Sequence, residues 1–122
     1  MTQPLALFLY EKLLPGTQLV NRLQDLGWRV QIIHDAAALS RSAEEHKPLL
    51  VLADLASTRS SVSEGLAALR SNKNTEHIPV IAFSADESLS APALQAGATL
   101  VVGEAAILQH LNQLIDQALS AF

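Results

Sequence analysis

The sequence predicts a doubly wound α/β domain, in which helices cover both faces of a five-stranded parallel sheet. Five apolar runs of strand length recur along the chain. Segments with helical spacing separate them, and such alternation favours parallel strands joined by right-handed crossovers. The length of 122 residues suits one domain over 1–122. The predicted strands occupy residues 5–9, 30–33, 49–53, 80–83 and 100–102.

The first two helices have recognisable ends. The first begins near Pro15, a residue tolerated in an opening turn, and ends at Gly27. Asp35 precedes an alanine-rich segment and is a natural N-cap of the second helix. The apolar stripe of the first helix is expected to face the sheet and consists of Leu19, Val20, Leu23 and Leu26.

The remaining elements differ in how clearly the sequence defines them. Residues 57–63 are rich in hydroxyl side chains and predict a mobile loop after the third strand. The fourth helix is expected to be short, over residues 92–96. The last helix gives the clearest amphipathic pattern, and its apolar side predicts packing on the sheet. This apolar side consists of Ile107, Leu108, Leu111, Leu114, Ile115, Ala118, Leu119 and Phe122.

Composition excludes several classes of function. The chain has no cysteine, which removes disulfides and thiolate chemistry, and its four histidines lack the spacing of metal ligands. The net charge is −4, and the few basic residues form no stripe that would bind nucleic acid. No apolar stretch approaches the roughly 20 residues of a membrane helix. We therefore expect a cytoplasmic protein that contacts neither nucleic acid nor membrane directly.

Four strings of residues accompany the predicted strands. They are Leu-Gln-Asp-Leu-Gly-Trp-Arg-Val at 23–30, Leu-Leu-Val-Leu-Ala-Asp at 49–54, Ile-Pro-Val-Ile-Ala-Phe-Ser-Ala at 78–85 and Ala-Gly-Ala at 96–98. In this order they resemble the receiver domain of two-component response regulators. The resemblance covers nearly the whole chain. It implies a flavodoxin-like three-layer sandwich and a role in phosphorelay signalling.

Receivers carry an acid pair after strand one, a phospho-accepting aspartate after strand three, a hydroxyl after strand four and a lysine after strand five. By position, Asp54 matches the phosphoacceptor and Ser84 the switch hydroxyl. The acid pair becomes Tyr10 and Glu11, so the resemblance leaves Glu11 and Asp54 as a weak site for Mg²⁺. Both the attacking carboxylate and the hydroxyl are chemically competent.

The sequence departs from the family at the position of the lysine. Counting from the Ala-Gly-Ala string places Glu104-Ala105 where receivers have Lys-Pro, or Gly103-Glu104 if the strand is one residue shorter. The cation that would bind phosphoryl oxygens is absent in either alignment. If Glu104 points into the pocket, it adds a third carboxylate to Glu11 and Asp54, a set that suits a hard cation and repels a phosphoryl group.

The resulting hypothesis is a pseudo-receiver that acts through protein–protein interaction. The alternative is a phosphorylatable receiver that accepts a phosphoryl group on Asp54 from a histidine kinase, with a metal or an arginine supplying the missing charge. Lys12 or Lys47 could also supply it by reaching over Asp54. The resemblance implies a histidine kinase or a downstream output protein as partner, or a second copy of the chain. Its usual contact surface is the fourth helix, fifth strand and fifth helix.

Each site residue also has a purely structural interpretation. Asp54 can start a turn by bonding the backbone two residues on, and Ser84 can cap the helix that follows. An enzymatic or nucleotide-binding role is disfavoured because the loop at residues 10–17 has one glycine and no phosphate-binding pattern. We therefore do not expect an enzyme.

Overall fold

A five-stranded, wholly parallel sheet forms the centre of the molecule, with strand order β2-β1-β3-β4-β5. The computed structural model describes residues 3–11, 13–56 and 61–120. Every strand lies within one residue of its predicted position, which confirms the doubly wound class. The strands are β1 (Leu5–Leu9), β2 (Arg29–Ile33), β3 (Leu50–Asp54), β4 (Val80–Ser84) and β5 (Leu100–Gly103).

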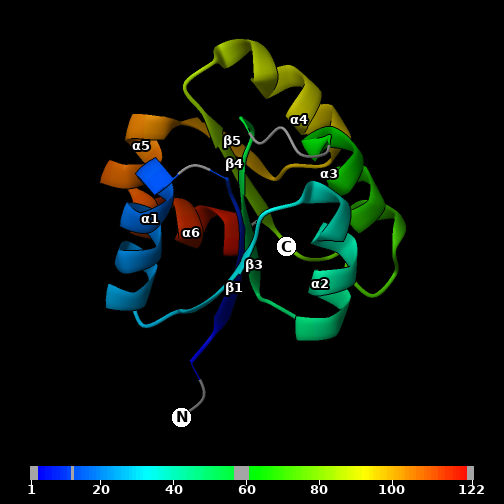
Figure 1. Ribbon diagram of the computed structural model, residues 1–122, viewed down its shortest axis with the longest axis horizontal. Helices are drawn as coiled ribbons and strands as arrows, with labels where there is room; N and C mark the ends of the chain where they lie inside the picture. The colour runs from blue at the N-terminus through cyan, green and yellow to red at the C-terminus, as the bar shows by residue number, and fades with distance from the viewer. Residues whose placement is uncertain (1–2, 12, 57–60, 121–122) are drawn as a thin grey trace.

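Helices cover both faces of this sheet and complete three layers (Figure 1). One layer contains α1 (Leu13–Asp25), α5 (Glu104–Gln109) and α6 (Leu111–Ser120). The opposite layer contains α2 (Leu39–His46), α3 (Val62–Ser71) and α4 (Ser90–Ala96), with the 3₁₀ turns η1 (Ala36–Ala38) and η2 (Glu87–Leu89) leading into α2 and α4.

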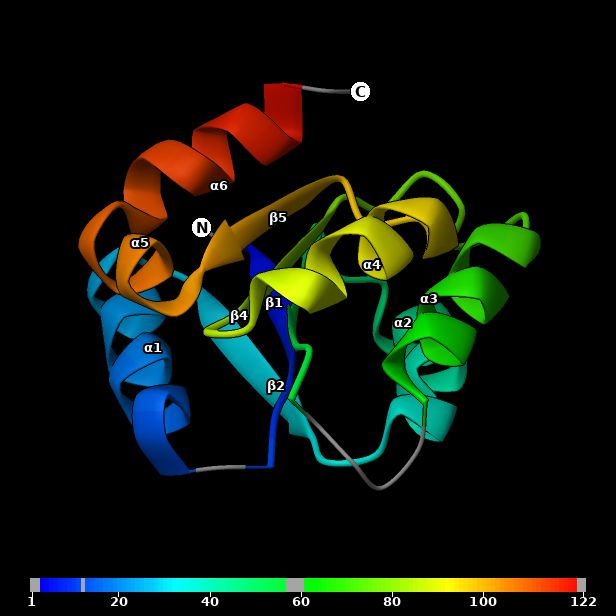
Figure 2. The same cartoon turned by 90° about the horizontal axis from the view of Figure 1, so that it is seen from above.

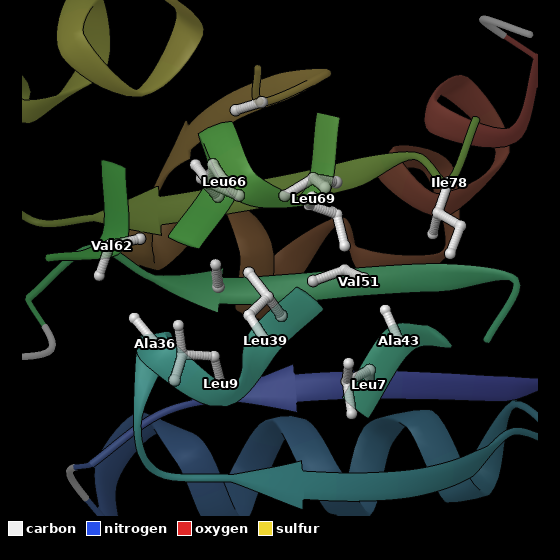
Figure 3. Packing of buried hydrophobic residues seen from close by; sticks show 14 of the residues in the cluster. Leu7, Leu9, Ala36, Leu39, Ala43, Val51, Val62, Leu66, Leu69 and Ile78 are labelled. Carbon is white, nitrogen blue, oxygen red and sulfur yellow. The ribbon is translucent and has the colours of Figure 1, made fainter. Parts of the chain in front are cut away.

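The core is divided in two by the sheet because successive side chains of a strand point to opposite faces. Leu7 and Leu9 of β1 pack with Leu39 of α2 and Leu66 of α3, as Figure 3 shows. Phe8 packs on the other face. All five residues of the central strand β3 are buried, as expected for a strand covered on both sides.

The first helix ends before its apolar stripe is complete. Leu19 and Leu23 are fully buried as predicted, but Leu26 is 43% exposed. The reason is that α1 ends at Asp25, so Leu26 belongs to the turn that Gly27 completes with a positive φ of 91°. The prediction that Leu26 faces the sheet is therefore wrong.

The predicted last helix is two helices. His110 has φ −124° and ψ 27°, outside the helical region, and separates α5 from α6. This change of direction, visible in Figure 2, lets α5 pack against α1 while α6 reaches β4. The apolar stripe is confirmed at Ile107, Leu111 and Ile115, which are buried on both sides of the break. Phe122 lies outside the described residues. Leu119, near the end of α6, is 38% exposed.

Two further predictions concern the loops that precede η1 and α3, on the other face of the sheet. Asp35 is the N-cap of η1, where its side chain accepts the N–H of Ala37 at 3.0 Å, so its capping role is confirmed. The mobile-loop prediction is wrong for residues 62 and 63, which belong to α3. Ser61 caps α3 by accepting the N–H of Glu64 at 3.2 Å, while residues 62 and 63 are helical. Residues 57–60 lie outside the described residues.

The fourth helix is short, as predicted, but begins two residues earlier, at Ser90. Within the described ranges, no helix combines the length and apolar character that crossing a bilayer requires.

Candidate functional site

The residues singled out in the sequence gather at the edge of the sheet where its strands end. In a parallel sheet all carboxyl ends lie on one side, and ligand sites of open α/β folds occur there. Asp54 is the last residue of β3 and pairs with Phe83, while Ser84 ends β4 and pairs with Gly103. The fold therefore places Asp54 and Ser84 at the ends of neighbouring strands.

Asp54 is nearly buried, with 4% of its surface exposed. One of its carboxylate oxygens, Oδ1, accepts the backbone N–H of Ala56 at 2.9 Å. This is the turn-starting bond that the structural interpretation anticipated. The backbone continues the pairing with β4 for one residue more, because Leu55 N donates to Phe83 O at 3.0 Å.

Ser84 also begins a turn. Its Oγ accepts the N–H of Asp86 at 3.0 Å, two residues along the chain. The expected helix cap is instead Asp86, whose Oδ1 accepts the N–H of Ser88 at 3.0 Å and its hydroxyl at 2.7 Å. These two bonds, first the hydroxyl and then the amide, lower the pKa of Asp86 below its ordinary value. Ser84 thus lies too early in the chain to cap η2.

Tyr10 replaces the first acid of the receiver pair with a buried aromatic ring. The ring centroid lies 4.6 Å from that of Phe8 and 5.5 Å, edge-on, from that of His34. The imidazole Nδ1 of His34 lies 2.7 Å from the carbonyl oxygen of Tyr10. A Cβ built on Gly16 would overlap the Tyr10 ring, so the ring occupies the space above that glycine.

Sequence patterns did not reveal this packing. Their only signal for it is the glycine inside the first helix, where glycine normally weakens a helix and therefore suggests a packing reason. The position of the first acid is consequently part of the hydrophobic layer beneath α1.

Glu104 begins α5, directly after β5, and is half-buried. It lines a cavity of about 530 Å³ together with Ser84 and Glu87. Glu11, after β1, is half-buried at the other side of the site. Among the described residues there is no group of three or more acidic or histidine side chains that could hold a metal ion.

The expected set of three carboxylates is therefore wrong. The physical reason is that β4 lies between β3 and β5, and neighbouring strands are about 4.8 Å apart. Glu104 thus starts about two strand spacings from Asp54, and the three carboxylates do not converge on one metal ion. Glu11 and Asp54 supply carboxylate oxygens of the kind that Mg²⁺ prefers, and a site with these two ligands stays a prediction.

Two of the described cations are at the opposite edge of the molecule. Lys47 follows α2 and precedes the amino end of β3. The guanidinium of Arg70 donates to the carbonyl oxygens of Gly97 at 2.9 Å and Ile78 at 2.6 Å, beside the starts of β5 and β4. Lys12 lies outside the described residues.

No protein-family model and no curated protein matches the chain. Several solved structures are similar to it in fold. The receiver domain of the sensor histidine kinase PA1611 from Pseudomonas aeruginosa PAO1, which holds a magnesium ion in its active-site cleft, superposes with a TM-score of 0.87 at 21% identity, over 98% of this chain and 99% of that one.

Two further structures agree. The chemotaxis protein CheY4 of Vibrio cholerae gives a TM-score of 0.84 at 14% identity, over 96% of this chain and 99% of that one. The receiver domain of a histidine kinase from Syntrophus aciditrophicus gives 0.83 at 17% identity, over 97% and 91%. The chain therefore has the flavodoxin-like fold of response-regulator receiver domains, as the resemblance implied.

Proposed function

We propose that this chain is a pseudo-receiver, a non-enzymatic signalling domain of a two-component or phosphorelay system that works through protein–protein contacts. The observation that carries the proposal is the position of Glu104. It follows β5, where receivers place the lysine that binds phosphoryl oxygens, and it is half-buried beside the switch hydroxyl of Ser84.

The charge reversal matters because phosphoryl transfer is catalysed mainly by positioning and by neutralising charge. A lysine at this position attracts the phosphoryl oxygens, whereas a carboxylate repels them. Glu104 therefore removes one stabilising interaction of an aspartyl phosphate and adds an unfavourable one. The partial burial of Glu104 strengthens the repulsion, since charges are screened less away from water.

The substitution of Tyr10 acts in the same direction. A receiver holds its divalent cation with an acid pair, and here the first position is an aromatic ring that is 7% exposed and packed on Phe8. If Mg²⁺ binds, Glu11 and Asp54 would be its protein ligands, and the cation would neutralise charge next to the attacking carboxylate.

Phosphorylation of Asp54 by a histidine kinase is the second candidate. It is favoured by the retained carboxylate and hydroxyl at the ends of β3 and β4, on neighbouring strands. In either case the proposed partners are a histidine kinase or a downstream output protein, which would meet the chain in the cytoplasm.

Acetyl phosphate separates the two candidates. The protein is incubated with acetyl phosphate and Mg²⁺, and its intact mass is measured beside that of the Asp54→Asn variant. We expect no phosphoryl adduct and no change in melting temperature with Mg²⁺, while circular dichroism confirms that both proteins are folded. An adduct that is present in the wild type and lost in Asp54→Asn would establish the phosphorylatable receiver instead.

A further inference from the structure

The cavity beside Glu104 is lined by apolar side chains and by two acidic residues. It lies between the β4–α4 connection and the start of α5 and has a volume of about 530 Å³. Ala85, Ala105 and Leu108 supply methyl and isobutyl groups, and Glu87 and Glu104 supply carboxylates. Such a surface combines what the stem and the head of a long basic side chain require.

The two carboxylates differ from their neighbour Asp86. The Asp86 carboxylate is engaged by both the amide and the hydroxyl of Ser88. Within the part of the chain that the structure describes, no hydrogen bond or ion pair engages the carboxylate of Glu87 or Glu104. Glu104 is half-buried and Glu87 is exposed, so both carboxylates are accessible to the side chain of a partner.

We propose that this cavity receives an arginine side chain of a partner protein. The proposal rests on the proposed function, in which the chain signals by contact, and it names the chemistry of that contact. The arginine methylenes would pack on Ala85, Ala105 and Leu108, and its guanidinium would pair with Glu87 and Glu104. Arginine suits the site better than lysine because its planar head binds carboxylates in a bidentate manner.

The same residue then has two effects. Glu104 disfavours a phosphoryl group at the site and attracts a partner's cation to it, in the position from which the lysine of a receiver is missing. The contact with the partner's arginine would then not depend on phosphorylation, because its opposite charges are always present. The contact is expected to weaken as salt is added, because its charges lie near the surface.

The experiment uses the ¹⁵N-labelled chain and a blocked pentapeptide, Ala-Leu-Arg-Leu-Ala. Its control peptide carries citrulline, which keeps the shape of arginine and loses the charge. We expect the arginine peptide to shift the amide signals of Gly103, Ala105 and Leu108, and to bind at least about fivefold more tightly than the citrulline peptide, the factor that about 1 kcal/mol of ion pairing provides.

Matched variants locate the site. Glu104→Gln and Glu87→Gln should each weaken the arginine peptide about threefold or more, whereas Glu64→Gln, an exposed acid of α3, should have no effect. Equal binding of both peptides, shifts confined to another face, or full binding by Glu104→Gln would overturn the proposal. Self-association that Glu104→Gln abolishes would identify a second copy as the occupant and also overturn it.

This outcome is separate from that of the acetyl phosphate experiment. A phosphoryl adduct would refute the pseudo-receiver whatever the peptides do. Failure of the arginine peptide without an adduct would refute only the docking site.

Discussion

Ser84, the last residue of β4, pairs in register with Gly103, the last residue of β5. Glu104 follows immediately, so the switch hydroxyl and the first residue of α5 line one cavity. The strand register thus places the Glu104 carboxylate at the same edge of the sheet as Ser84. A single substitution at Glu104 can consequently test whether the charge at this position governs phosphorylation of Asp54.

The first prediction is that Glu104→Lys gains phosphorylation on Asp54. The substitution turns repulsion of the phosphoryl oxygens into attraction, and one preorganised electrostatic contact is worth about tenfold or more in rate. We expect a phosphoryl adduct after incubation with acetyl phosphate and Mg²⁺, measured by intact mass over time, at a rate at least about tenfold above that of the wild type.

Two variants control this experiment. Glu104→Gln removes the negative charge without adding a positive one and should give an intermediate or undetectable rate. The double variant Asp54→Asn/Glu104→Lys should give no adduct. If Glu104→Lys is folded and gives no more adduct than the wild type, the charge of residue 104 does not limit phosphorylation, and the buried Tyr10 becomes the stronger explanation.

The second prediction concerns the glycine beneath that tyrosine. Gly16→Ala would normally strengthen a helix by about 1 kcal/mol. Here the new methyl group would lie 2.5 Å from Cε2 of the Tyr10 ring, and the ring is held against Phe8. We expect a net loss of about 1–2 kcal/mol in the free energy of unfolding, since overpacking costs about 1–3 kcal/mol, as measured by urea denaturation.

A double-mutant cycle tests the cause of that loss. In a Tyr10→Leu background the smaller side chain leaves room, so Gly16→Ala should be neutral or stabilising. Gly103→Ala is the control for a glycine with open space around it, because no heavy atom would lie within 4 Å of a Cβ at that position. Equal losses in both backgrounds would show that contact with Tyr10 is not responsible.

The fold was predictable because each strand is a short apolar run bounded by polar or turn residues, and β1 was placed without error. The ends of the helices were harder to predict from the sequence. Leu26 follows the helical spacing of its neighbours and yet is exposed, because Gly27 changes the backbone direction one residue later. His110 likewise interrupts a continuous amphipathic pattern that carries no proline or glycine. A break without proline or glycine depends on packing rather than on local propensity, so the sequence pattern does not show it.

The site was predictable only in part. Counting along the chain placed Asp54, Ser84 and Glu104 at the correct edge of the sheet. Counting could not show that Glu104 is one strand too far from Asp54 to share a metal, since this depends on strand order in space. Nor could it show that Tyr10 turns inward over Gly16. The first fact depends on how strands distant in the sequence are ordered, and the second on how the side chain of Tyr10, directly after β1, packs against α1.

The third prediction is that Arg70 is a structural clamp at the edge opposite the site. Its guanidinium bonds the carbonyl oxygens of Gly97, Ile78 and Glu76, the last at 2.8 Å, and so joins α3 to the starts of β4 and β5. Partial burial lowers the pKa of Arg70. We expect Arg70→Ala to reduce the free energy of unfolding by about 2–4 kcal/mol, because several charge-assisted bonds are lost together. Urea denaturation measures this loss.

Two variants show whether geometry or charge is responsible. Arg70→Lys keeps the charge but cannot reach several carbonyl groups from one planar head, so it should recover less than half of the loss. Lys73→Ala, an exposed cation two residues beyond α3, should change stability by less than about 0.5 kcal/mol. Full recovery by lysine would mean that the carbonyl network contributes little.

The fourth prediction concerns Asp86, the N-cap residue of η2. Bonds from the Ser88 hydroxyl and amide stabilise the ionised form of Asp86 and lower its pKa in the folded protein. Because the folded-state pKa is the lower one, the stabilisation from this group is complete above the unfolded-state pKa. It is lost as the pH falls through the folded-state pKa. A ¹³C NMR titration of the Asp86 carboxyl should therefore show a midpoint below the ordinary aspartate value.

Ser88→Ala removes the larger of the two causes and leaves the backbone amide in place. The Asp86 midpoint should move upward, part of the way to its ordinary value, and Ser90→Ala should leave it unchanged because no bond joins Ser90 to Asp86 in the described chain. An unchanged midpoint in Ser88→Ala would assign the low pKa to another cause. A midpoint that moves fully to the ordinary value would mean that the turn itself opens, which would also free Ser84 from the Asp86 amide and alter the cavity beside Glu104.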